Sequence, residues 1–400
     1  MIKIAQLIKS TLLLTLIAAP LIVNADTTKA KSTGRPKVGL VLAGGGALGI
    51  AHLGVLKVLE ANRIPVDIIT GTSMGSIVGA GYASGASIEE MEATLSNTDW
   101  DALFNESLKR EDIDYRSKYG RGGQILGDAK IGIKEGGLAK FTGVVSGQHV
   151  LPLLQKLYYR TPGNVDFDKL QIPYRAVAAD IETGQAVPLS SGELALAARA
   201  SMAVPGFFTP VEIDGKALVD GGIANNLPVD IALEMGAKRL IVVDLLADLK
   251  TKDELGNLFG ISGQIISLLL QQNSTLQRKN MRPGDLLLVP DLKGYSATDF
   301  KHAKAILAKG EAVALANLKQ LRKFSVSEAE YRRYKENREN STPPVPVIDA
   351  IQIDTDLPAL HKSIDNNFAF QIGQPLDTDQ IAKTLDKVYT GGSLTSLSYT

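Results

Sequence analysis

The pattern of apolar residues changes along the chain, and from residue 38 onward short apolar runs alternate with amphipathic segments. The runs KVGLVLAGG (37–45) and VDIITGTS (66–73) are rich in Val, Ile and Leu, as is typical of strands buried on both faces of a sheet. Between them, GVLKVLEAN (54–62) spaces its apolar residues three and four apart, which predicts a helix. Such alternation predicts a three-layer α/β fold with a mostly parallel central sheet.

The same alternation resumes after residue 170. Strands are predicted at 174–180, 216–220 and 239–246, with helices between them at 193–204 and 227–236. The glycine-rich segment 100–165 predicts loops or hairpins, followed by a capped helix that begins near Ser146.

From about residue 255 to 335 the chain is mainly helical. The segment 260–280 carries a dense apolar stripe made of Ile261, Ile265, Ile266, Leu269 and Leu270. We interpret the stripe as packing against the chain's own core. A homodimer surface and contact with lipid are the alternatives. The proline-rich stretch STPPVPV (341–347) predicts a boundary between domains.

The first 25 residues carry a different pattern. Lys3 and Lys9 precede the apolar run TLLLTLIAAPLIV (11–23), and small residues follow, which is the layout of a secretory signal peptide. A membrane anchor is the alternative, but the run is short for a span and is interrupted by a proline. We therefore expect residues 26–37 to be a linker. We expect export to the periplasm or outer membrane, with the cell surface as a further destination.

The composition removes several classes of function. The 400 residues include 43 Lys and Arg against 43 Asp and Glu, so net charge offers no reason to expect nucleic acid as a partner. The chain has no cysteine, which excludes disulfides, thiolate metal sites and a cysteine nucleophile. With only four histidines, a zinc site is not expected either, and we predict neither a metal nor a cofactor.

The stretch GTSMGS (71–76) carries the most specific chemical signal. Gly71 and Gly75 flank Ser73 in the G-x-S-x-G arrangement, which places a nucleophilic serine on a sharp turn between strand and helix. A serine hydroxyl needs a neighbouring base to take its proton. The four histidines are His52, His149, His302 and His361. None of them lies in a context typical of an active-site loop, so another residue type must supply the base.

A glycine-rich loop precedes this motif. Gly44, Gly45 and Gly46 lie between a predicted strand and helix, where their N–H groups could form an oxyanion hole. Gly44, Gly46 and Gly49 also fit G-x-G-x-x-G, the turn that binds dinucleotides. That alternative needs an acidic residue at the end of the second strand. Asp67 lies instead at its beginning, so the ribose contact is missing.

The candidate base is Asp220, in the DGG stretch that follows a predicted strand. Ligand-facing groups collect at strand ends in open α/β sheets. A carboxylate is a weaker base than imidazole, but desolvation in a cleft would raise its pKa. An Asx-turn residue that closes a loop is the alternative role for Asp220. Four neighbours are expected to support this loop, with the asparagine side chains bonding to backbone: Gly221, Gly222, Asn225 and Asn226.

Two further polar residues are assigned structural roles. Asp180, in the stretch AADIETG, is interpreted as a turn residue rather than a third catalytic group. His52 follows the glycine loop on an apolar helix face, and we interpret it as a packed core histidine.

The stretches GGGALG, GTSMG and DGG, in this order and spacing, resemble those of bacterial patatin-like phospholipases. ARASMAVPGFFTPV and DGGIANNLPVDIALEMGAKRLIVVD are also similar, so the resemblance covers about residues 38–325, within a hydrolase domain of 38–340. It implies a Ser–Asp dyad of Ser73 and Asp220, with the glycine loop as oxyanion hole. It also implies hydrolysis of phospholipids or other lipid esters at a membrane surface.

The chain departs from this family at Leu48, where the family usually has Arg or Lys. A cation there would support the loop and could attract an anionic head group. Its absence leaves the backbone donors in place but bears on rate and head-group preference. The alternative function is a non-catalytic lipid-binding or envelope assembly protein that keeps the fold.

Residues 345–400 resemble a POTRA module, mainly through IGQPLDTDQIAKTLDKVY (372–389). The closing strand is missing, so we expect the module to be incomplete. The combination resembles patatin–POTRA–barrel proteins of the type V secretion kind. We therefore expect the parent polypeptide to continue into an outer-membrane barrel.

Overall fold

The computed structural model describes most of the chain between residues 34 and 340. The described ranges are 34–104, 133–134, 137–138, 145, 147, 149–161, 163–245, 248–249, 251–252, 258–340, 347–348, 372–375, 377, 380–381 and 384. The chain divides into two compact units, 1–35 and 36–400, and every helix and strand given below belongs to the second. The predicted signal peptide and most of the POTRA-like module lie outside the described residues.

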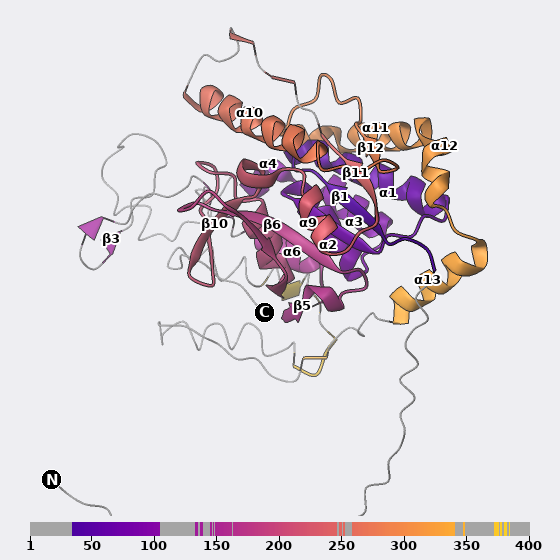
Figure 1. Cartoon of the computed structure of the whole chain (residues 1–400). Helices are drawn as coiled ribbons and strands as arrows, with labels where there is room; N and C mark the ends of the chain where they lie inside the picture. Colours follow the sequence, from indigo (N-terminus) through magenta and orange to yellow (C-terminus); the bar gives the residue numbers. More distant parts are fainter. Residues whose placement is uncertain are drawn as a thin grey trace, which may run out of the picture. The chain divides into compact units, whose positions relative to one another are not determined.

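An eight-stranded sheet forms the centre of the fold (Figure 1), in the order β12-β11-β1-β2-β6-β10-β9, with β7 paired to β6. Its strands are β1 (Val38–Leu42), β2 (Ile68–Thr72), β6 (Tyr174–Asp180), β7 (Ala186–Leu189), β9 (Val211–Ile213), β10 (Lys216–Asp220), β11 (Arg239–Val243) and β12 (Leu286–Leu288). Strands β1, β2 and β11 are buried along nearly their whole length, which explains their continuous apolar runs. The predicted α/β class is confirmed.

The sheet is parallel from β12 to β6 and antiparallel where β6, β7, β9 and β10 pair. Asp214 and Gly215 connect β9 to β10, and both have positive φ angles, 51° and 73°. A two-residue Asp-Gly turn of this kind fixes a hairpin, so β10 runs antiparallel to β9, and it also pairs antiparallel with β6. The sheet is therefore mixed. The alternation of strands and helices in the sequence did not reveal its antiparallel part, because that part includes a hairpin set by a local turn.

Helices cover both faces of the sheet. On one face α2 (Met74–Ser84) packs against β2 and β6, and α7 (Leu194–Ser201) packs against β6 and β10. On the other face α8 (Gly222–Asn225) contacts β6, and α9 (Val229–Glu234) contacts β1 and β2. The long helix α10 (Leu258–Arg278) lies against α8 and α9 (Figure 1). These three layers agree with the predicted architecture.

The remaining helices lie around these layers or between the strands. They are η1 (Gly46–Ile50), α1 (Ala51–Ala61), α3 (Ile88–Asn97), α4 (Trp100–Phe104), α6 (Val150–Leu157), η2 (Phe167–Lys169), η4 (Phe300–His302), α11 (Ala303–Ala316), α12 (Leu318–Leu321), η5 (Arg322–Phe324) and α13 (Glu328–Asn340). Short strands outside the main sheet pair as β3 (Ile133–Lys134) with β4 (Gly137–Leu138), and β5 (Asn164–Asp166) with β8 (Ser191–Glu193). Helix α6 begins at Val150, later than predicted from Ser146.

The prediction that the apolar residues of α10 pack into the core is wrong for most of them. Ile261, Ile265 and Leu269 are exposed to solvent, whereas Ile266 and Leu270 are half-buried. The helix turns its polar residues toward the domain instead, through contacts described below. Among the described helices, none has both the length and the apolar character that crossing a membrane requires.

Candidate active site

Ser73 lies on the turn between β2 and α2 and has a backbone conformation that few non-glycine residues adopt, with φ 53° and ψ −124°. The glycines on either side allow this turn. A Cβ on Gly71 would lie 2.4 Å from the carbonyl oxygen of Gly75, and a Cβ on Gly75 would lie 2.3 Å from that of Leu42. Both contacts are too short for real atoms, so the turn requires glycine at these two positions.

The register of the sheet brings Asp220 next to Ser73. Thr72, at the end of β2, pairs with Val177 of β6, and Asp220, at the end of β10, pairs with the next residue, Ala178. Ser73 and Asp220 therefore flank the same part of β6. Their exposed fractions are only 8% and 6%, so both side chains are largely withdrawn from water.

The Asp220 carboxylate accepts the N–H of Gly222 at Oδ1 over 2.8 Å, and the Ser73 side chain is near enough to act on its pKa. Burial raises the pKa of Asp220 to about 6, and the interactions with Ser73 and Gly222 oppose the shift without cancelling it. The carboxylate is thus a stronger base than an exposed aspartate and is still ionised at neutral pH. This geometry fits proton transfer from the serine hydroxyl.

The histidines of the described chain have other surroundings. His52 is fully buried and bonds through Nε2 to the carbonyl oxygen of Ala43 over 2.8 Å, and burial lowers its pKa to about 4. The Nδ1 of exposed His302 lies 3.9 Å from the Asp299 carboxylate, and His149 occupies the position before α6 without a side-chain capping bond. His361 lies outside the described residues. The packed role predicted for His52 agrees with its burial.

The glycine loop runs beside Ser73. A Cβ on Gly44 would lie 2.9 Å from the Cβ of Ser73, and Gly46 has a φ of +57° that suits glycine. The N–H of Gly44 donates to the carbonyl oxygen of Asn226 over 3.3 Å, so it is not free to serve as the predicted oxyanion donor. Within the described chain, the N–H groups of Gly45 and Gly46 have no hydrogen-bond partner. Gly49 packs tightly against Met74: a Cβ added to Gly49 would lie 2.4 Å from the Cγ of Met74.

The loop that follows Asp220 is attached to β2. The hydroxyls of Thr72 and Thr70 donate to the carbonyl oxygens of Asn225 and Pro228 over 2.8 and 3.0 Å. Gly221 approaches β6 so closely that a Cβ would lie 2.1 Å from the carbonyl oxygen of Val177. These contacts hold the loop, and with it Asp220, at a fixed distance from the elbow.

Of the two asparagines, Asn226 bonds to backbone as predicted and Asn225 does not. The amide of Asn226 donates to the Gly44 carbonyl over 3.5 Å and to Ser274 of α10 over 3.2 Å. The amide of Asn225 donates to the Asp230 carboxylate over 2.8 Å rather than to backbone. Asn226 therefore joins the glycine loop to the Asp220 loop, whereas Asn225 fixes its own loop to α9.

Ser201, at the end of α7, is a site residue that the sequence did not reveal. Its hydroxyl accepts the N–H of Ser73 over 2.9 Å and donates to the carbonyl oxygen of Val177 over 2.6 Å. All three groups are buried. The residue lies in the stretch ARASMAVPGFF, but a serine in an alanine-rich helix has no spacing pattern that would single it out.

Three other positions have clear structural roles. Leu48 has no exposed surface, so the side chain at this position does not face a lipid head group. Asp180 accepts hydrogen bonds from the Glu182 N–H and the Thr183 hydroxyl, as predicted for a turn residue. Asp67 accepts the N–H of Val38 at the beginning of β1, away from the glycine loop at the end of that strand, which argues against a dinucleotide site.

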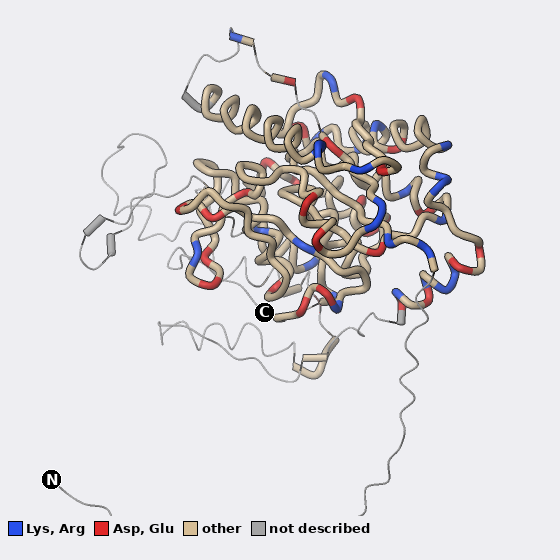
Figure 2. Tube along the Cα trace, viewed as in Figure 1, with Lys and Arg blue, Asp and Glu red and all other residues tan. Residues whose placement is uncertain are grey.

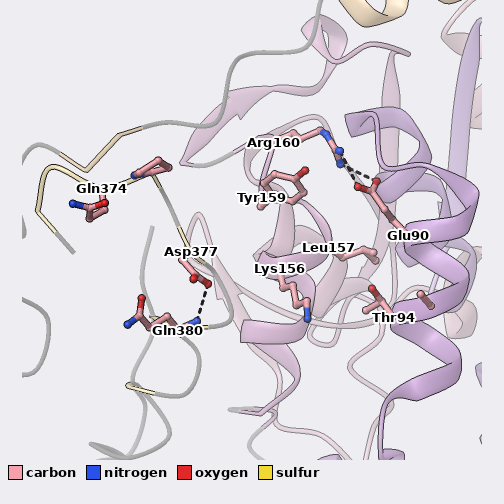
Figure 3. Close-up of a pocket in the computed structure, with 11 residues that line it drawn as sticks. Glu90, Thr94, Lys156, Leu157, Tyr159, Arg160, Gln374, Asp377 and Gln380 are labelled. Atoms are coloured by element: carbon pink, nitrogen blue, oxygen red, sulfur yellow. Dashed lines mark hydrogen bonds and ion pairs between the residues drawn. The ribbon is translucent and has the colours of Figure 1, made fainter. Parts of the chain in front are cut away.

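A separate pocket is lined by residues of α3, residues at and just after the end of α6, and four residues near the C-terminus (Figure 3): Gln374, Pro375, Asp377 and Gln380. Arg160 makes two hydrogen bonds to the Glu90 carboxylate there, over 2.8 and 2.9 Å. Neither Ser73 nor Asp220 lines this pocket. The ion pair serves to tie α3 to the end of α6.

Residues 40–233 match a family model described as Patatin-like phospholipase. Human Patatin-like phospholipase domain-containing protein 6 is 33% identical over 214 residues, which are 52% of this chain and 13% of that protein. An uncharacterized NTE family protein of Mycobacterium tuberculosis is 31% identical over 217 residues, 54% of this chain and 51% of that protein. The matched segment is thus about an eighth of the length of the human protein and about half of the length of the mycobacterial protein. VipD from Legionella pneumophila is a solved structure with a TM-score of 0.40 at 13% identity, covering 88% of this chain and 79% of that one.

Proposed function

We propose, from the premise that residues 40–233 form a patatin-like phospholipase domain, that the chain is a serine lipid acyl hydrolase. Ser73 is the nucleophile and Asp220 the base of a Ser–Asp dyad. The observation that carries the proposal is that these two buried side chains flank the same part of β6, together with the raised pKa of Asp220, about 6. A base with this pKa is ionised at neutral pH, and the serine hydroxyl beside it is the proton donor that it would serve.

The reaction proceeds through an acyl-enzyme. The Asp220 carboxylate takes the hydroxyl proton of Ser73 while the oxygen attacks the ester carbonyl, which forms a tetrahedral intermediate. The intermediate collapses as Asp220 returns the proton to the leaving alcohol, and the acyl group stays on Ser73. Water then attacks the acyl ester, giving its proton to Asp220, and the acid product leaves as Ser73 recovers that proton.

The N–H groups of Gly45 and Gly46 are the proposed oxyanion donors. They lack partners within the described chain and belong to the loop that lies against Ser73. The positive end of the helix that follows adds to the favourable field for a developing negative charge. Gly44 contributes instead by its small size and by its bond to Asn226, which fixes the loop.

The proposed substrates are phospholipids or related lipid esters. The support is the family description and the printed names of the relatives, which include phospholipase and esterase. Residues 1–25 would direct export to the cell envelope, where such lipids are accessible. N-terminal sequencing of the mature protein tests this export, since cleavage near residue 25 is expected.

A fluorophosphonate probe and a short-chain soluble ester test the dyad, because both require an activated serine. The full chain should react with the probe and hydrolyse the ester, whereas Ser73→Ala and Asp220→Asn should each abolish both reactions. The two losses should not add in the double variant, because the residues act as one unit. Ester hydrolysis by Asp220→Asn near the rate of the unmodified chain would refute the dyad. Failure of the full chain to react would favour the non-catalytic alternative.

A further inference from the structure

Helix α10 is fixed to the Asp220 loop by polar side chains on one of its faces. Asn273 donates to the carbonyl oxygens of Gly222 and Ile223 over 3.0 and 2.9 Å. Four residues further along, Gln277 donates to the Asp230 carboxylate over 2.9 Å. This helix is therefore joined directly to the loop that bears the proposed base.

The outward side of α10 exposes large apolar side chains, with the exposed polar residues Gln272 and Thr275 among them. We use the name α10 stripe for the exposed large apolar residues, which differ in part from the positions that the sequence pattern singled out: Ile261, Ile265, Leu268, Leu269 and Leu276, each between 37% and 58% exposed. Their spacing places them on one side of a helix with 3.6 residues per turn. Gln277 lies away from this side, and Asn273 lies at its edge, about 40° around the helix from Leu269. A stripe facing away from the core normally carries polar residues, so this arrangement is the reverse of an ordinary surface helix.

The helix also lacks charge. No Asp, Glu, Lys, Arg or His occurs in α10 before its last residue, Arg278. Figure 2 shows the helix in tan, whereas blue and red mark charged residues at many other places along the chain. A charged group costs several kcal/mol to move into hydrocarbon, so an uncharged face meets no such penalty when it enters a lipid surface.

We propose that the α10 stripe docks the domain on a lipid surface and brings the proposed active site to the substrate. The inference rests on the proposed function, because lipid esters in a membrane are the substrates that such docking would serve. Contact through α10 places the Asp220 loop at the lipid boundary, since Asn273 ties the two together. The helix lies along the interface, with its apolar face in the acyl boundary and its polar face on the domain.

A second copy of the chain is the competing occupant of this face. The exposed surface of the α10 stripe is on the order of 400 Å², about half of the ~800 Å² that each partner contributes to a stable protein interface. The stripe alone is therefore too small for a stable dimer. Binding of an interfacial helix to lipid scales with the apolar area that it buries and needs no matching protein surface.

Sedimentation with vesicles of phosphatidylcholine and phosphatidylglycerol tests the proposal. The full chain carries Ser73→Ala throughout, so that vesicles are not consumed. The α10 variant adds Ile265→Asp and Leu268→Asp. The control variant adds Leu315→Asp on α11, because the exposed fraction of Leu315, 50%, is close to the 53% of Ile265. Every variant keeps the same N-terminal segment, so its contribution to binding is common to all. Thermal unfolding verifies that each variant is folded.

We expect the α10 variant to partition onto vesicles at least tenfold more weakly than its parent, and the control to match the parent. Equal binding by the α10 variant, equal loss in the control, or no binding by the parent would overturn the proposal. If the α10 variant only converts a dimer to a monomer in sedimentation velocity, the face belongs to a second copy. Absence of Ser73-dependent hydrolysis of a soluble ester would refute the proposed function separately, since that substrate needs no docking.

Discussion

Replacing Ser201 by alanine removes the hydroxyl that holds two backbone groups around the proposed nucleophile. In the folded protein this hydroxyl accepts the Ser73 N–H over 2.9 Å and donates to the Val177 carbonyl over 2.6 Å. Alanine leaves the N–H of Ser73 buried without an acceptor. Because Ser73 has a φ of 53°, the lost bond also removes a restraint on an uncommon backbone conformation.

The expected cost has a stability part and a kinetic part. A buried donor without a partner costs about 1–3 kcal/mol, which corresponds to a drop of several degrees in Tm. A shift of about 1 Å in a catalytic group costs up to about 100-fold in rate. We therefore expect Ser201→Ala to lower kcat by about 10- to 100-fold on a soluble ester, with KM nearly unchanged, because Ser201 does not contact the substrate in this proposal.

Ser76→Ala is the matched control for this experiment. The Ser76 hydroxyl is equally buried and donates to the Ser73 carbonyl over 2.7 Å. That carbonyl also accepts the backbone N–H groups of Ser76 and Ile77, so it keeps partners when the hydroxyl is lost. We expect a loss of about 1 kcal/mol in stability and a kcat close to that of the unmodified protein. Equal losses of kcat in the two variants, or full kcat in Ser201→Ala, would refute the positioning role.

Three further predictions concern Asp220 and Leu48. Because the proposed base Asp220 would act in its ionised form, kcat/KM should fall about tenfold per pH unit below about 6 and be level above it. A limb near pH 4 would contradict the desolvated carboxyl. The raised pKa means that the folded state binds this proton more tightly than the unfolded state. As pH rises through about 4 to 6, the group should therefore remove about 3 kcal/mol of stability. Asp220→Asn should abolish this dependence of stability on pH and raise the Tm at pH 7, which thermal unfolding at pH 4 and pH 7 would measure. An unchanged or lower Tm at pH 7 would contradict this prediction. Leu48→Arg should destabilise the fold by several kcal/mol, because the position is fully buried, and an unchanged urea midpoint would contradict this expectation.

Some features of the fold could be predicted because they depend on short, local patterns. The apolar runs of β1, β2 and β11 are buried strands, as their continuous Val, Ile and Leu residues indicated. Gly71 and Gly75 occur where a Cβ would collide with backbone, so the elbow leaves a clear mark in the sequence. These features are visible in sequence because a single residue type satisfies each local requirement.

Other features depend on register between segments that are far apart in the chain. The Gly44 N–H is occupied by the Asn226 carbonyl, 182 residues away, and no pattern in either segment indicates the bond. Ser201 reaches Ser73 across 128 residues for the same reason. The apolar stripe of α10 predicted a helix correctly, but periodicity alone cannot distinguish a face that packs on a core from one that is exposed. The partner of a face is set by tertiary packing.

The connections around the Asp220 loop explain how a carboxylate could serve where histidine is more usual. Thr70 and Thr72 attach the loop to β2, Asn226 attaches it to the glycine loop, and Asn273 attaches it to α10. A loop held on three sides keeps Asp220 buried beside Ser73, and that burial is what raises its pKa to about 6. Loosening any of these attachments would admit water, lower the pKa and lengthen the path of the proton. The basicity of the proposed dyad therefore comes from the packing of the loop rather than from the intrinsic chemistry of aspartate.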